Sequence, residues 1–89
     1  MNKENLERTF DNRLWDADCT VEEATGLAQA LYDQLDNIID PIARVDKYAD
    51  MNNEQVSLVA EGVVSRKRAL ITLSGALLDK LSQVHRKLQ

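Results

Sequence analysis

Between Leu14 and Ala49 an apolar residue recurs at alternating steps of three and four, without interruption. Apolar residues that repeat every 3.5 positions lie on one side of an α-helix, along the line where it packs against a second helix. The sequence therefore predicts an all-α protein in which this segment lies along another helix. The repeating positions are Leu14, Ala17, Val21, Ala24, Ala28, Leu31, Leu35, Ile38, Ile42, Val45 and Ala49.

The segment from Glu54 to Leu88 contains neither Pro nor a cluster of turn residues, and it predicts a second, long helix. At 1.5 Å per residue this helix would be roughly 50 Å long, whereas a globular chain of this size has a radius of gyration of about 12 Å. We therefore expect an elongated molecule or part of a larger assembly. Its apolar stripe is too broad for one neighbour, and comprises Val56, Ala60, Val63, Val64, Leu70, Ile71, Leu77, Leu78, Leu81, Val84 and Leu88.

Turn and capping signals divide the chain into an arm and a helical domain. The run Asp16–Thr20 is typical of a turn, and Thr20 followed by Glu23 forms a capping box that predicts a helix start near Val21. Residues 1–19 are accordingly expected to be a polar arm or a short helix that docks Phe10 on the core. Residues 20–89 are expected to form the domain.

Asp40-Pro41 predicts an interruption of the first long helix. Asp is a good N-cap and Pro is favoured at the first helical position, which indicates a stop near Ile39 and a restart at Pro41. A kinked but continuous helix is the alternative. With Asn52 or Asn53 as the next cap, the expected helices are 21–39, 41–49 and 54–88, arranged as an antiparallel hairpin with one long C-terminal helix.

Length and composition limit the classes of protein to consider. The 89 residues make one domain, 44% are apolar, and only three Gly, one Pro and four aromatic residues occur, which favours helix. The N-terminus has no apolar signal region and no apolar run is long enough to span a membrane. The single Cys19 cannot form an internal disulfide, so a reducing cytoplasm is the expected location. We interpret Cys19 as a small, half-buried residue, with a reactive role as the alternative.

No pattern of residues predicts catalysis or metal binding. Asp16-x-Asp18 begins like a calcium loop but lacks the glycine and the third oxygen ligand. His85 is the only histidine and Cys19 the only thiol, which is too few for a zinc site or a catalytic triad within one chain. We therefore expect no enzyme, no cofactor and no metal site.

The charges are strongly segregated. Residues 1–54 carry 13 acidic and 5 basic residues, whereas residues 55–89 carry 2 acidic and 6 basic ones. The basic triplet Arg66, Lys67 and Arg68 could pair within the chain with Asp33, Asp36 and Asp40, or bind a protein or nucleic acid. The three aspartates could serve solubility, or could bind a basic groove on a partner. These six residues are the candidate partner-binding site, and the lack of an aromatic stacking platform argues against nucleic acid.

The row Val64, Ile71 and Leu78 is the candidate dimer interface, because one neighbouring helix cannot cover both sides of the broad stripe. The sequence thus predicts hairpins that pair into a dimeric helical bundle, and a non-catalytic interaction protein that binds, inhibits or adapts another cytoplasmic protein. A small dimeric DNA-associated regulator that uses the basic residues of the long helix is the alternative. In its small size, acidity and helical pattern the chain resembles short accessory proteins of bacteria and phages.

Overall fold

The computed structural model describes the backbone of residues 3–89 and the side chains of Thr9 and residues 11–89. All regular structure in residues 3–89 is helical, as the sequence predicts. The expected docking of Phe10 lies outside the described side chains. The elements are α1 (Lys3–Ile39), the 3-10 turns η1 (Asp40–Ile42) and η2 (Tyr48–Asp50), and α2 (Asn53–Leu88).

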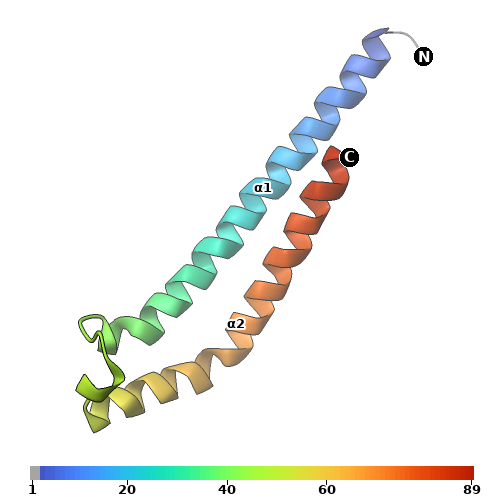
Figure 1. Cartoon of the computed structure of the whole chain (residues 1–89). Helices are drawn as coiled ribbons and strands as arrows, with labels where there is room; N and C mark the ends of the chain where they lie inside the picture. The colour runs from blue at the N-terminus through green and yellow to red at the C-terminus, as the bar shows by residue number, and fades with distance from the viewer. Residues whose placement is uncertain (1–2) are drawn as a thin grey trace.

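The two long helices pack against each other along most of their length (Figure 1). Two contacts between residues far apart in sequence fix the direction of α2 relative to α1. Thr20 in the middle of α1 contacts Lys87 at the end of α2. Nearer to the connection, Gln34 of α1 contacts Arg66 of α2. The particle measures 69 × 23 × 16 Å and its radius of gyration is 20.2 Å. It is therefore elongated and only one layer of helices thick, and Figure 1 also shows that α2 bends in its first half.

The first helix is continuous through the predicted turn at Asp16–Thr20, so that prediction and the capping box at Thr20 are wrong. The Thr20 hydroxyl donates a hydrogen bond of 2.9 Å to the carbonyl of Asp16 one turn earlier. A threonine inside a helix satisfies its hydroxyl in this way, so the residue types that favour a turn are tolerated there. The expected arm is in fact the first part of α1 from Lys3 onward.

The connection between the helices corrects a second prediction. α1 ends at Ile39 as expected from Pro41, but no helix follows at 41–49, and only the two short 3-10 turns form there. Asp40 does not act as a cap, because η1 has no side-chain cap hydrogen bond and its N-cap position is Ile39. Without a side-chain cap, a helix of nine residues is too short to be stable.

The second helix begins with the predicted cap at Asn52. The Asn52 side chain accepts a hydrogen bond of 2.8 Å from the Gln55 amide, and the Gln55 side chain accepts one of 2.9 Å from the Asn52 amide. This reciprocal capping box satisfies two amide groups that the helix itself leaves free. Gln55 also donates to the carbonyl of Pro41 at 3.3 Å, which ties the start of α2 to η1.

We expect Asn52→Ala to lower the free energy of unfolding by about 0.5–2 kcal/mol, because it removes the side-chain oxygen that accepts a hydrogen bond from the Gln55 amide. Asp40→Ala is the matched control. It removes an acidic side chain that makes no cap hydrogen bond, so little change is expected. Urea denaturation followed by circular dichroism measures both variants. Equal losses for the two would contradict the assignment of the cap.

The core is a narrow strip between the two helices. Its buried apolar residues are Ala17, Ala24 and Ile38, and none of the large side chains described in residues 11–89 is completely buried. The 3.5-residue repeat predicts that Leu35 and Val63 are buried in the core, but they remain 42% and 45% exposed. Two helices can cover each other along only one line, so the second side of each apolar stripe has no neighbour in this chain.

Candidate interaction surface

One side of the helix pair is held together by polar contacts. Lys80 forms an ion pair with Glu23, with 2.5 Å between Nζ and Oε2. One Arg66 guanidinium nitrogen donates a hydrogen bond of 2.6 Å to the Gln34 side chain. The Lys87 ammonium donates to the hydroxyl of the buried Thr20 at 2.8 Å. These contacts fix the register of α1 against α2 along this side.

The other side of the pair is apolar and open. Val21 and Ala28 of α1 and Leu77 and Leu81 of α2 line one shallow hollow between the helices. Their α1 positions repeat every seven residues, so the same line continues along the helix in both directions. We call this surface the apolar face and define it by Leu14, Val21, Ala28, Leu35, Val63, Leu77, Leu81 and Leu88, of which all but Leu77 are exposed.

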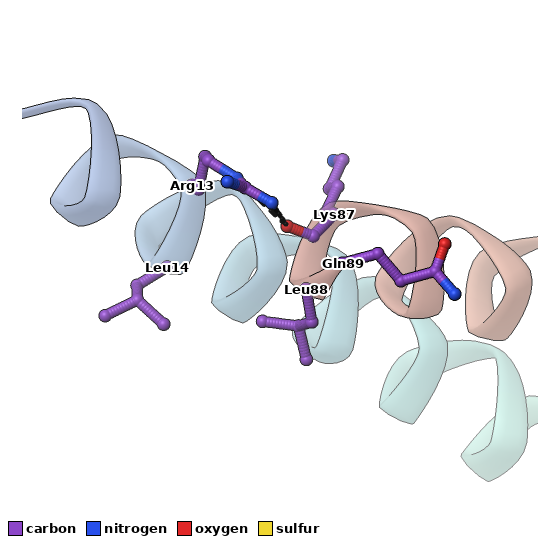
Figure 2. A pocket seen from close by; sticks show the side chains of 5 residues that line it. All are labelled: Arg13, Leu14, Lys87, Leu88 and Gln89. Atoms are coloured by element: carbon purple, nitrogen blue, oxygen red, sulfur yellow. Dashed lines mark hydrogen bonds between the residues drawn. The ribbon is translucent and has the colours of Figure 1, made fainter. Parts of the chain in front are cut away.

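Figure 2 shows that the polar contacts and the apolar side chains lie on opposite sides of the helix pair at the end of α2. The Arg13 guanidinium donates to the backbone carbonyl of Lys87 at 3.3 Å, and so satisfies a carbonyl that the last turn of the helix leaves free. Leu14 and Leu88 point together to the opposite side of this contact. The apolar face therefore reaches the end of the paired region, where these residues line a hollow.

The row Val64, Ile71 and Leu78, which the sequence indicated as a dimer interface, is 66%, 72% and 65% exposed. Each of these residues lies one position after Val63, Leu70 or Leu77, and one residue is about 100° round the helix. The row therefore lies further round α2 than the apolar face, on the far side of the line of Lys67 and His85. Nothing in the described part of the chain covers it.

The charged candidate residues do not form one site. Asp33, Asp36 and Asp40 are exposed, and in the described side chains neither they nor the basic triplet take part in an ion pair. Asp33 instead accepts a hydrogen bond of 3.0 Å from Gln29. The interpretation that these aspartates pair with the triplet inside one chain is thus wrong, because they lie on the outer side of α1.

The basic triplet is also dispersed. Arg66 turns toward α1 and binds Gln34, whereas Lys67 and Arg68 are exposed. Successive residues of a helix point about 100° apart, so the three cations face three directions. A nucleic-acid site would need them on one surface.

Two kinds of chemical site can be checked against the described residues: a metal site and a reactive cysteine. No group of three or more His, Cys, Asp or Glu among them is placed to hold a metal ion. Cys19 is half-buried in the middle of α1, and burial, followed by the negative charges of Glu22, Asp18, Asp16 and Glu23, raises the pKa of its thiol. A raised pKa keeps the thiol protonated and poorly nucleophilic. Within residues 3–89, no helix has the length and apolarity needed to cross a membrane.

The ion pair on the polar side predicts a dependence of stability on pH. The hydrogen bond and positive charge of Lys80 lower the pKa of Glu23 below its ordinary value of 4.5. The pair therefore stabilises the fold above that value, and this contribution is lost as the pH falls through the lower pKa of the folded state. Glu23 is more than half exposed, so the effect is small.

We expect the melting temperature of Glu23→Gln to fall less than that of the wild type as the pH is lowered from about 5 toward 3. Lys80→Gln should flatten the acid limb to the same extent, because either change removes the same pair. Thermal melts across this range measure the effect. A wild-type slope retained in both variants would contradict the role of the pair.

The sequence predicts the exposed row on α2, but the open surface also extends over α1. The prediction of a fully buried 3.5-residue seam holds only where one neighbouring helix covers the whole seam. The signal was present, because Leu14, Val21, Ala28 and Leu35 already form a line of their own at intervals of seven. A second line of this kind on the same helix indicates a second neighbour.

No protein-family model, curated protein or solved structure matches this chain.

Proposed function

We propose that this chain is a small, non-catalytic helical interaction protein that binds another protein chain through the apolar face. The observation that supports the proposal is the continuity of that face. It runs from Leu14 and Leu88 at one end to Leu35 and Val63 toward the connection. Contiguous exposed apolar surfaces of this length are typical of protein interfaces.

The proposal includes the finer expectations drawn from the sequence. The antiparallel hairpin serves as a rigid platform, and dimeric pairing into a helical bundle is one way of covering the face. Inhibition or adaptation of a partner would follow from occupying its surface, and the cytoplasm is the proposed location. The alternative of a DNA-associated regulator has less support, because Arg66, Lys67 and Arg68 face three directions.

The proposal is tested by replacing apolar residues of the face with charged ones. In Val21→Glu combined with Leu81→Glu, two carboxylates enter the central hollow of the face. Leu58→Glu is the matched control, because Leu58 has the same 45% exposure as Val21 but lies on the other side of α2. Chemical crosslinking of the purified chain and of extracts of the source cell, followed by mass spectrometry, identifies bound chains.

We expect the wild type and the Leu58→Glu control to crosslink to a protein chain through the apolar face, and the double variant to lose that product. A product that is equally abundant in all three proteins would contradict the proposed surface. The absence of any product involving residues of the face would contradict the proposed function.

A further inference from the structure

We infer that the chain covering the apolar face is a second copy of this protein, related to the first by a twofold axis parallel to the helices. The inference rests on the proposed function and deepens it by naming the partner. In this arrangement α1 of each copy lies over α2 of the other. Four helices then enclose one core, in which every helix is antiparallel to both of its neighbours.

The exposed area of the single chain supports a large interface. The accessible surface is 7133 Å², whereas compact monomers of this mass expose about 5,300 Å². The difference, about 1,800 Å², falls in the range that each partner buries in large, permanent dimers. The particle is also only 16 Å thick, so a second layer of helices is what a closed core lacks.

The positions of the apolar residues along the helix axes, here called their heights, are compatible with pairing to a second copy. Leu14 lies beside Leu88, and Val21 lies beside Leu81, so the two helices present their apolar residues in level pairs. A twofold axis parallel to the helices leaves every height unchanged. Each pair therefore meets the identical pair of the other copy, and these levels of the core are closed by four apolar side chains.

The two edges of the apolar face carry opposite charges. On α1, Asp18 and Asp36 are separated by about five whole turns and lie on one line, about 60° round the helix from Val21 and about 100° from Leu35. On α2, the positive charge of Lys67 lies on the corresponding edge, and His85 lies about five turns further along the same line. All four side chains are exposed.

The acidic edge of one copy lies against the basic edge of the other in this arrangement. The hydrogen bond between Gln34 and Arg66 places Asp36 and Lys67 within about one turn of the same height. Since the axis preserves height, Asp36 lies beside Lys67 of the other copy. Charges that flank an apolar seam in this way select the partner and its orientation.

The alternative twofold axis, perpendicular to the helices, is disfavoured by the same charges. It would place α1 on α1, and seven acidic residues with no basic one occur between Leu14 and Ala43. Acidic edges would then lie against each other. Like charges in contact across an interface are unfavourable, so the axis parallel to the helices is the one that the charge pattern selects.

A charge exchange across the two edges tests the inference. The proteins are the full chain, Asp36→Lys, Lys67→Glu and the double variant that carries both changes. Asp33→Lys is the matched control, because it makes the same change of charge on α1 about 60° further from the face. Sedimentation equilibrium at low and high salt gives the mass and the dimer dissociation constant, and circular dichroism verifies that each variant retains its helix content.

We expect the wild type to have twice the mass of the 10.1 kDa chain. Each single variant should dimerise about tenfold more weakly at low salt, since the pair occurs twice per dimer. The double variant should recover the wild-type constant, and Asp33→Lys should retain it. High salt should reduce the differences.

A wild-type mass of one chain at micromolar concentrations would overturn the second copy as occupant. The crosslinking test of the proposed function would then decide separately whether a different protein uses the face. A dimer whose dissociation constant is unaffected by Asp36→Lys and Lys67→Glu, or is not restored in the double variant, would overturn the proposed axis.

Discussion

Replacement of Ile38 by Ala is expected to lower the free energy of unfolding by about 2–4 kcal/mol. Ile38 is 6% exposed and is the largest of the buried apolar side chains described in residues 11–89. It packs beside Gly62 of α2, where even an added methyl group would lie in ordinary contact with Ile38 Cγ1 at 3.6 Å. The substitution leaves a cavity between the two helices, near the end of α1 and the connection that follows it.

The matched control is Leu58→Ala, which also shortens an aliphatic side chain but at a position that is 45% exposed. Almost half of its surface is exposed, and Leu58 lies outside the apolar face, so a loss below about 1 kcal/mol is expected. Chemical denaturation of both variants measures the difference. A loss for Ile38→Ala as small as that of the control would show that this crossing does not stabilise the fold.

Enlargement of Ala24 to Leu is expected to destabilise the protein by about 1–3 kcal/mol. Ala24 is buried near the middle of the helix pair, beside the ion pair of Glu23 and Lys80. Ala24 is only 5% exposed although it borders the hollow of the apolar face, so most of a larger side chain would have to enter the space between the helices. The resulting displacement of the helices should weaken the ion pair and its effect on the pKa of Glu23.

Glu22→Leu provides the comparison for Ala24→Leu, because it places the same side chain on the exposed side of α1. Leucine and glutamate have similar helix propensities, so the change should be close to neutral. Thermal melts of the two variants distinguish packing from propensity. Ala24→Leu with a melting temperature at or above that of Glu22→Leu would contradict the close packing of the helices at this point.

The helices themselves could be predicted from the sequence, and the reasons are local. The end of α1 at Ile39 follows from the backbone restriction that Pro41 imposes, and the start of α2 follows from the capping ability of Asn52. The turn at Asp16–Thr20 was predicted wrongly for a local reason as well. The Thr20 hydroxyl can cap a helix or bond back one turn within it, and contact with Lys87 is tertiary information.

The open surface was only half predictable, because burial depends on how many helices one chain supplies. The repeat in α2 correctly indicated that Val64, Ile71 and Leu78 would be exposed. The exposure of Leu35 and Val63 could not be derived from their spacing, which is that of core residues. Their spacing and their exposure agree once a second layer of helices is added to the pair.

Small-angle X-ray scattering of the wild-type chain in solution tests the central claim most directly, since it gives mass and length together. Side-by-side pairing along the apolar face predicts a particle of twice the 10.1 kDa mass, with a longest dimension close to the 69 Å of one chain. A particle with the mass of one chain, or a dimer nearly twice as long, would contradict the account.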